Sequence, residues 1–498
     1  MEVLLSWAAL VLLGGLSGAL WLLAGPRRRG RQRGLPPGPS PLPLVGNLLQ
    51  LDPGAMHRSL EQLSKRYGPV YTIHLGSLPC VVLCGYQAVK EALVDQADDF
   101  SGRGAFPVFD RFTRGNGIAF SNGEKWKILR RFALQTLKNF GMGRSSIEEQ
   151  IQEEAQCLVR EFQKTGGAPF NPINLVCRAV SNIICAVVFG NRFDYEDADF
   201  LSLLDHLNEN FKIMSSFWGV LYNIFPRLMD LLPGPHQQIF CNFEKLRQFI
   251  TERVRRHQEA LDPSAPRDFI DCFLIRMEKE KEAPLSYFHT ETLVMTTHNL
   301  FFGGTETTST TLRYSFLILM KYPQVAAQVH QEIDRVIGRE RAPCLADRTL
   351  MPYTEAVLCE IQRFISMLPM GLPRAVTQDT PFRDFLLPKG THVIPLLSSV
   401  HFDPSQFKDP NSFNPANFLD ENNAFRSSDA FMPFAPGKRI CLGAGLARME
   451  IFLFLATLLQ HFTFRPLVPP AEIDLTPQCT GLGNVPPPFE FQVLSRSP

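Results

Sequence analysis

One cysteine of this chain, Cys441, lies in a segment whose neighbours could make its sulfur reactive. The segment reads Phe-Ala-Pro-Gly-Lys-Arg-Ile-Cys-Leu-Gly and comes directly before a predicted helix. Lys438, Arg439 and the positive end of that helix would favour the thiolate over the thiol. The two glycines would let the backbone approach a bulky, flat group, because glycine carries no Cβ atom. With no second cysteine or histidine nearby, the sulfur cannot complete a tetrahedral zinc site, but it could be the single axial ligand of a haem.

A second segment that could do chemistry runs from Phe288 to Lys321, where the spacing of apolar residues predicts a helix. Gly303 and Gly304 lie in its middle, where each glycine costs about 1 kcal/mol relative to alanine. The hydroxyls of the next five residues, Thr-Glu-Thr-Thr-Ser, can bond back to helix carbonyls and bend the helix. We therefore expect a groove at this point, which could admit dioxygen.

The overall composition narrows the classes of protein to which the chain can belong. Lys and Arg number 50 and Asp and Glu number 49, so the net charge of +1 gives no general electrostatic reason to bind nucleic acid. Phe is abundant, with 40 residues against 4 Trp and 9 Tyr, which indicates an apolar interior with few polar groups. The eleven cysteines are dispersed and include no C-x-x-C pair, which argues against a disulfide framework and for a reducing compartment.

The cysteine segment also follows a family pattern. Its spacing is F-x-x-G-x-R-x-C-x-G, formed by Phe434, Gly437, Arg439, Cys441 and Gly443. This pattern resembles the haem-binding loop of the cytochrome P-450 family, and the local sequence is most similar to the mammalian microsomal family-two monooxygenases. The resemblance implies haem b as the cofactor, held by these loop residues, with the Cys441 thiolate as the axial ligand of the iron.

The same resemblance assigns roles to two further pairs of residues. Glu306 and Thr307 resemble the family's acid and alcohol pair, which relays protons during cleavage of the O–O bond. Glu360 and Arg363, one helical turn apart, resemble the E-x-x-R pair that locks the family's core around the haem. The family usually adds an arginine further along the chain, where this sequence has Asn417. Asn417 could form a hydrogen bond but supplies no cation, so the third member of this network departs from the family.

Haem carries two propionates, so cations and donors from separate segments should converge on it. Trp126 and Arg130 resemble the family's W-x-x-x-R motif, which implies that both bind one propionate. Arg103, Arg374 and Arg439 occupy matching places in the drug-metabolising branch of the family, where Arg374 replaces a more usual histidine. The resemblance therefore predicts a set of propionate ligands drawn from distant parts of the chain.

The resemblance also implies that the substrate site has apolar or small walls. Such walls favour lipophilic substrates that bind mainly through buried area, and the candidate classes are xenobiotics, fatty acids and steroids. The predicted substrate-binding residues are Phe120, Phe211, Phe302, Gly303, Leu368, Leu372 and Leu482.

The N-terminus predicts a membrane anchor. Val3 to Ala24 contains no charged residue, and about 20 apolar residues suffice for a helix to cross a bilayer. The arginines between residues 27 and 33 should remain on the cytoplasmic side, with Met1 in the lumen. We predict a signal-anchor transmembrane helix over 1–25, a basic, proline-rich linker over 26–45 and a monooxygenase domain over 46–498. The resemblance implies the endoplasmic reticulum membrane, a single pass and a catalytic domain that faces the cytosol.

The body is expected to be mainly α-helical with small β-sheets, and the resemblance implies the cytochrome P-450 fold. No long polar linker, repeat or low-complexity block interrupts it, so one large domain is expected. Apolar residues three to four apart predict helices at 145–164, 200–213, 240–261, 288–321, 325–337, 354–365 and 446–461. Short strands are expected at 70–75, 81–83, 393–397 and 489–493.

Electrons must come from a partner, because no convincing dinucleotide-binding motif is present in the sequence. The resemblance implies an NADPH-dependent diflavin reductase, with cytochrome b5 as a second candidate. An acidic donor would suit the basic helix predicted from Lys125, Lys127, Arg130, Arg131 and Lys138. A phospholipid membrane is the other expected partner, because the apolar segment 217–226 reads either as a loop that dips into the bilayer or as a buried loop.

Two other functions are compatible with the same cysteine loop. An isomerase or dehydratase on this scaffold would use a hydroperoxide and need no electron donor, but the intact pair of Glu306 and Thr307 speaks against it. A haem-dependent binding or sensor protein would show ligand-induced spectral shifts without turnover. Monooxygenation remains the function that the sequence favours.

Overall fold

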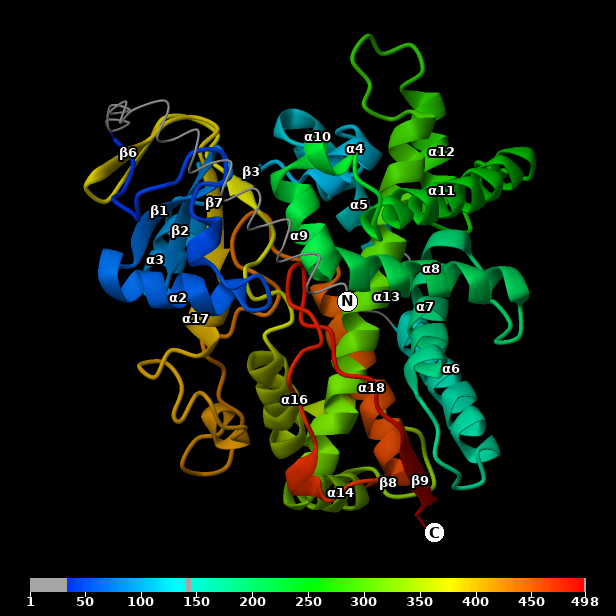
Figure 1. Ribbon diagram of the computed structural model, residues 1–498. Coiled ribbons are helices and arrows are strands. Elements are labelled where there is room, and N and C mark those ends of the chain that lie inside the picture. Colours follow the sequence, from blue (N-terminus) through cyan, green and yellow to red (C-terminus); the bar gives the residue numbers. More distant parts are fainter. Residues whose placement is uncertain (1–33, 140–144, 497–498) are drawn as a thin grey trace.

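The structure is a computed structural model that describes residues 34–139 and 145–496. Helices dominate the regular structure and the strands are few and short, so the predicted mainly α-helical fold with small sheets is confirmed (Figure 1). The helices of the first half are α2 (Met56–Tyr67), α3 (Tyr86–Lys90), α4 (Pro107–Thr113), α5 (Gly123–Asn139), α6 (Ser145–Lys164), α7 (Ile173–Phe189), α8 (Ala198–Ser215), α9 (Phe217–Ile224) and α10 (Pro226–Met229). Those of the second half are α11 (His236–Glu259), α12 (Phe269–Lys279), α13 (Thr290–Lys321), α14 (Pro323–Val336), α15 (Leu345–Arg348), α16 (Pro352–Ile365), α17 (Ser398–His401) and α18 (Ala444–His461).

Helical periodicity located the long helices well. In α6 the fully buried residues Ile147, Ile151, Ala155, Leu158 and Phe162 recur every three or four positions and form one apolar stripe. All seven predicted helices are present, although α11 and α8 extend beyond the predicted ranges by a few residues. The apolar segment 217–226, expected as a loop, instead contains α9, so that expectation was wrong about its secondary structure.

The strands form one larger sheet and two small ones. Their bounds are β1 (Val70–Leu75), β2 (Leu78–Cys84), β3 (Gly102–Arg103), β4 (Arg374–Ala375), β5 (Thr380–Phe382), β6 (Phe385–Leu387), β7 (His392–Leu396), β8 (Phe462–Pro466) and β9 (Phe491–Ser495). The larger sheet has the order β1-β2-β7-β4-β3, while β5 pairs with β6 and β8 with β9. The predicted strand at 489–493 thus begins two residues later than expected.

The larger sheet supports two residues of the site. Alternate side chains of a strand point to opposite faces, and here both faces are covered. Val81 belongs to one apolar cluster, while Ile73 packs in another with Leu60 of α2. At the far edge of the sheet, β3 pairs antiparallel with β4 so that Arg103 lies opposite Arg374. The sheet therefore brings two distant arginines side by side.

The helix α13 runs through the centre of the helical part of the molecule, with α16 and α18 beside its lower half (Figure 1). Most of its side chains are buried, from Thr292 near its start to Met320 near its end. Such a helix, buried on nearly all sides, gives the residues near Gly303 a fixed position against α7 and α18. Pro323 begins the next helix and ends this one.

The predicted membrane anchor over 1–25 lies outside the described residues. Within 34–139 and 145–496, no helix is both long enough and apolar enough to span a bilayer. The described part of the proline-rich linker packs on β1, where the Pro36 carbonyl accepts a 2.8 Å hydrogen bond from Thr72 Oγ1. Gly38 passes so close that a Cβ atom there would lie 1.8 Å from the Thr72 carbonyl oxygen. This part of the linker is therefore attached to the body.

Candidate functional site

Cys441 lies in the irregular chain just before α18, and its loop closes on itself. Its backbone N–H donates to the carbonyl of Phe434 at 3.0 Å. Gly437 has a φ of +81°, and a Cβ atom there would lie 1.7 Å from the carbonyl oxygen of Leu93. At Gly443, in contrast, no protein atom lies within 4 Å of a Cβ position. Gly443 thus faces a space that a flat group could fill. At Gly437, in contrast, glycine is needed because the backbone at Leu93 passes too close for a side chain.

The thiol of Cys441 experiences opposing influences. Desolvation by the surrounding protein has the largest effect and raises the pKa of the thiol overall, although the Gly443 backbone N–H and the charges of Arg130 and Arg448 act to lower it. Arg130 reaches the loop from α5 and donates to the Ile440 carbonyl at 2.6 Å. Arg448 stands on the second turn of α18 with its guanidinium 5.0 Å from the ring centroid of Phe434. These two arginines are the cations placed to favour a thiolate.

Lys438 and Arg439, the two cations that precede Cys441 in the sequence, bind other groups. The expectation that they act on the thiol was therefore wrong. Lys438 points away to Asp98, with 3.2 Å between Nζ and Oδ1. Arg439 Nε donates to the Ser101 carbonyl at 2.8 Å, and its guanidinium lies 3.7 Å from the ring centroid of Trp126. Lys438 and Arg439 lie in a tight turn, closed by a hydrogen bond from the Ile440 N–H to the Gly437 carbonyl, and their side chains leave it in different directions. No sequence pattern had indicated Arg448.

Three of the predicted propionate ligands come together as buried cations. Arg103, Arg374 and Arg439 are 9%, 3% and 6% exposed. Burial, together with repulsion among these arginines and from Arg130, lowers the pKa of Arg439 to about 8 and that of Arg374 well below its ordinary value. None of the three forms an ion pair with a carboxylate of the described chain, and Arg374 Nε and Arg439 Nη1 lack any hydrogen-bond partner there.

Such a cluster requires anions, because burying unpaired charges is costly. Two carboxylates beside Cys441 would satisfy it, and a haem carries two propionates. Trp126 and Arg130 lie on the face of α5 that meets the cysteine loop, as their contacts with Arg439 and Ile440 show. The donor set of the site therefore fits a haem with its iron at Cys441.

Across the centre of the molecule, α13 presents Gly303 and Thr307 on an accessible face. Apart from the adjoining backbone of α13 itself, no atom of the described chain lies within 4 Å of a Cβ position at Gly303, and the Thr307 hydroxyl donates to the Gly303 carbonyl at 2.7 Å. The predicted bonding of hydroxyls back to helix carbonyls is thus present, although the helix continues without a break. Glu306 is buried, and one of its carboxylate oxygens lacks a partner in the described chain. Burial raises its pKa to about 7, with Arg313 acting in the opposite direction.

Comparison with known proteins decides the family. The family model described as Cytochrome P450 matches residues 36–493. The chain belongs to the cytochrome P450 family. It is similar to Cytochrome P450 2F2 of Mus musculus, with 60% identity over 457 residues that cover 92% of this chain and 93% of the relative. Identity with Cytochrome P450 2F1 of Homo sapiens is 58% over 492 residues, or 99% of each chain, and with Cytochrome P450 2B4 of Oryctolagus cuniculus it is 52% over 494 residues, or 99% of this chain and all of the relative.

The predicted family, the monooxygenase class and the haem cofactor are confirmed by this membership. Members of the cytochrome P450 family bind haem through a cysteine thiolate. The roles predicted for individual residues stay predictions.

The E-x-x-R pair of this cytochrome P450 is fully buried. Arg363 Nε and Nη2 donate to the two carboxylate oxygens of Glu360, both at 2.7 Å. The remaining donors of Arg363 reach the carbonyls of His401, Pro410 and Ser412. The pair therefore fastens α16 to the irregular chain that leads toward Cys441.

Asn417 interacts more weakly with Glu360 than the arginine that the family usually has at this position would. Its Nδ2 lies 3.5 Å from Glu360 Oε1, a long hydrogen bond, and its Oδ1 accepts from the Lys408 N–H at 2.8 Å. The Asn414 N–H supplies the shorter contact to Glu360, at 2.8 Å. Because Arg363 already neutralises Glu360, the network is satisfied without a third charge.

Six of the seven predicted substrate-binding residues, all except Gly303, belong to or pack against the large apolar cluster at the core of the helical part. The ring of Phe211 lies 6.4 Å from that of Phe302, and a Cβ atom on Gly483 would contact both Phe211 and Leu368. Phe120 reaches the same wall through Phe109, whose ring lies 4.3 Å from Phe120 and 6.1 Å from Phe302. Leu372 and Leu482 belong to this cluster as well. Phe109 was not among the residues predicted from the sequence.

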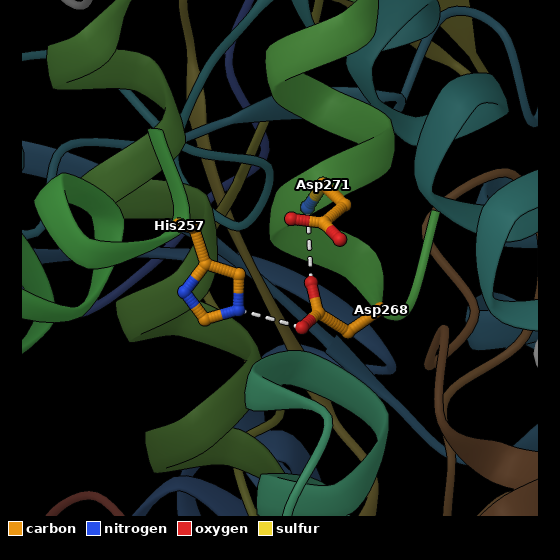
Figure 2. Close-up of side chains that lie close together, drawn as sticks. All are labelled: His257, Asp268 and Asp271. Atoms are coloured by element: carbon orange, nitrogen blue, oxygen red, sulfur yellow. Dashed lines mark hydrogen bonds and ion pairs between the residues drawn. The ribbon is translucent and has the colours of Figure 1, made fainter. Parts of the chain in front are cut away.

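One further group of metal-ligating side chains comes together within the described ranges, namely His257, Asp268 and Asp271 (Figure 2). His257 Nε2 lies 2.6 Å from Asp268 Oδ2, and Asp268 Oδ1 caps α12 by accepting from the Asp271 N–H. Arg267 donates three hydrogen bonds to the Asp271 carboxylate, two from its guanidinium and one from its backbone N–H. Because protein partners already occupy these atoms, we assign the group to the packing of α11 against α12.

Proposed function

We propose that this cytochrome P450 inserts one oxygen atom from O₂ into small lipophilic substrates, with electrons from NADPH delivered by a diflavin reductase. The observation that carries the proposal is the cluster of buried arginines without carboxylate partners in the described chain, one of which, Arg439, lies two residues before Cys441. When bound through Cys441, haem supplies the activation of oxygen. Arg103, Arg374 and Arg439, with Trp126 and Arg130, would hold its propionates.

The chain's own residues would control the delivery of protons. Glu306 has a pKa of about 7, so it can both hold and release a proton at neutral pH. Thr307 stands next to it with an accessible hydroxyl that could pass a proton from Glu306 toward the space beside Gly303. Since the hydroxyl now donates to the Gly303 carbonyl, it must rotate to act as a relay.

The aromatic wall supports a lipophilic substrate. Phe109, Phe120, Phe211 and Phe302 offer large apolar surfaces, and buried area is the main source of affinity at such walls. Gly303 leaves room for a substrate to approach α13. Xenobiotics, fatty acids and steroids remain the candidate classes.

A basic hollow next to the cysteine loop supports an acidic electron donor. It has a volume of about 520 Å³, and Leu134, 41% exposed, contributes an apolar centre. The cations around it are Lys127, Arg130, Arg131, Lys138 and Lys438. Charge complementarity of this kind steers association and would suit the reductase, with cytochrome b5 as a second candidate.

Exposed leucines support contact with the endoplasmic reticulum membrane. Leu231 and Leu232, which follow α10, are 82% and 43% exposed, and Leu44 is 63% exposed. The two regions meet at Gly76, where a Cβ atom would contact Phe225 and the Leu44 carbonyl. Together with an anchor over 1–25, this apolar patch would hold the catalytic domain on the cytosolic face.

Replacing Cys441 tests the haem ligand directly. The reduced wild-type protein under carbon monoxide should show the long-wavelength Soret band that reports thiolate ligation. Cys441→Ser should lose that band, because a hydroxyl is a far weaker ligand than a thiolate. Cys177→Ser is a matched control, since Cys177 is buried in α7 and should leave the band unchanged.

Persistence of the band in Cys441→Ser would identify another residue as the ligand. The monooxygenase proposal has a separate test, which is oxygen consumption by the haem-loaded protein with NADPH and the reductase. If no substrate-dependent consumption follows, or if product forms from a hydroperoxide without any reductase, the proposed reaction is wrong.

A further inference from the structure

His298 is a buried polar side chain that has no role in the proposed haem site, proton relay or substrate wall. It lies on α13 one turn before Phe302 and is fully buried, yet neither ring nitrogen has a hydrogen-bond partner in the described chain. Its ring centroid lies 4.8 Å from that of Phe112 on α4 and 5.0 Å from that of Phe243 on α11. An imidazole therefore stands among aromatic rings where a phenyl ring would pack as well.

The imidazole is neutral in these surroundings. Burial lowers the pKa of His298 to about 3, so at neutral pH one ring nitrogen carries a proton and the other carries a lone pair. The ring thus offers one donor and one acceptor, and leaving both unused costs free energy. Since buried polar groups are nearly always paired, both ring nitrogens are free to take a partner that comes from outside the chain.

The position of His298 connects it to the proposed substrate wall. Its ring lies parallel to that of Phe302, with the centroids 6.1 Å apart and the planes 6° apart. Phe302 is only partly buried and also contacts Phe109. The adjacent residue Asn299 accepts hydrogen bonds from the backbone of residues 118 and 119, which fixes this turn of α13 against the chain before Phe120. His298 therefore lies directly behind the accessible aromatic surface.

We infer that His298 determines substrate specificity by hydrogen-bonding the hydroxyl group of an aromatic, otherwise apolar substrate. For such a substrate to insert, Phe302 and Phe112 must move apart, because the imidazole is fully buried against both rings. A hydroxyl suits the neutral ring because it can donate to the lone pair or accept from the N–H. An ionised group would instead bring an unpaired charge among aromatic side chains. This inference rests on the proposed function, because it specifies the class of substrate for the same site.

The test compares indane with 5-hydroxyindane, which are nearly the same in shape and differ by one hydroxyl. Dissociation constants come from titrations of the haem-loaded protein in which the shift of the Soret band is followed. The wild-type protein should bind 5-hydroxyindane more tightly by about 3- to 10-fold, the net contribution of one hydrogen bond. His298→Phe keeps a planar ring without nitrogen atoms and should lose this preference, whereas His298→Gln, which retains a donor and an acceptor, should keep it.

Thr297→Val provides the matched control, because Thr297 is the adjacent residue, is fully buried and also lacks a partner in the described chain. This variant should keep the wild-type ratio of dissociation constants. His298→Leu is a second apolar variant with the same expectation as His298→Phe. The inference is overturned if both apolar variants retain the ratio, or if the wild-type protein shows no preference. Failure of the proposed function would differ, because the wild-type protein would then lack the thiolate band or reductase-driven oxygen consumption.

Discussion

Glu306 and Thr307 are neighbours in the sequence, but α13 places one in the buried interior and the other at an accessible surface. The carboxyl group is buried with one oxygen unpaired, and the hydroxyl bonds back to the Gly303 carbonyl. A pKa raised to about 7 means that Glu306 carries its proton below that pH and loses it above. A relay that donates protons should therefore weaken as the pH rises through this value.

Glu306→Gln tests this relay. Substrate turnover should fall by about 100-fold, since the amide cannot release a proton. The wild-type rate should decline as the pH rises from 6 to 8, and the residual rate of the variant should be flat over this range. Substrate affinity, measured by spectral titration, should be unchanged. A variant that keeps both the wild-type rate and its pH profile would remove Glu306 from the relay.

The two loop glycines allow a comparison of protein packing with cofactor packing. Gly437→Ala places a methyl group against the Leu93 carbonyl at a positive φ, so it should destabilise the fold by about 2 kcal/mol or more. Gly443→Ala meets no protein atom and should leave the stability of the haem-free protein nearly unchanged while reducing haem content. Thermal unfolding and the haem absorbance per protein measure the two effects. Equal destabilisation by both substitutions would contradict this distinction.

Among the helices, α4 depends on a polar contact with its neighbours. Arg111 of α4 donates to the Tyr222 hydroxyl of α9 at 2.9 Å, and both pair with Asp230, just after α10. Asn223 adds a second connection by accepting from the Val108 N–H at 3.0 Å. The helix α4 carries Phe109 of the aromatic wall, so these contacts hold the wall in place from the outside.

Tyr222→Phe should loosen α4. Losing the hydroxyl removes two hydrogen bonds and should raise the rate of backbone hydrogen exchange in residues 105–115 by about 5-fold, equivalent to about 1 kcal/mol. Mass spectrometry of proteolytic fragments measures this exchange. Arg255→Ala is the control, because it removes an exposed ion pair on α11 and should not affect α4. Unchanged exchange in Tyr222→Phe would show that α4 is held by apolar packing alone.

For the molecule as a whole, the buried contact between α11 and α12 makes stability depend on pH. Burial alone would lower the pKa of His257, but the hydrogen bond and charge of Asp268 outweigh it, so the pKa lies above the ordinary 6.5. Both ring nitrogens face acceptors, Asp268 and the Arg253 carbonyl, which favours the doubly protonated ring. A raised pKa stabilises the fold fully below pH 6.5 and loses this contribution as the pH rises through the folded value.

The melting temperature of the wild-type protein should therefore fall as the pH is raised above 6.5. His257→Asn cannot take up the proton and should lose this part of the pH dependence, with a lower melting temperature at pH 6. Differential scanning calorimetry at several pH values measures both. If the curves of the two proteins run parallel across the whole range, His257 does not gain a proton on folding.

Much of the site could be predicted from the sequence because its motifs are local. Each of the three motifs, namely the cysteine loop, the E-x-x-R pair and the glycine pair of α13, spans no more than about ten residues. The structure places the glycine pair inside a helix and the cysteine just before one, as predicted, and Glu360 forms an ion pair with Arg363. Arg448 and His298 could not be found in this way. Arg448 acts on the thiol only because α18 places it beside Phe434, and His298 is unpaired because two distant helices, α4 and α11, surround it with aromatic rings.

The sequence by itself determined most of the long helices, the candidate haem-ligating cysteine and the apolar character of the interior, because periodicity and spacing act between near neighbours. The helix α7, 17 residues long, was not predicted. Only the tertiary structure decided which cations face Cys441, why Gly437 must lack a side chain and which arginines remain without anions. These properties depend on burial and on contacts between residues far apart in the chain, and a linear pattern contains neither.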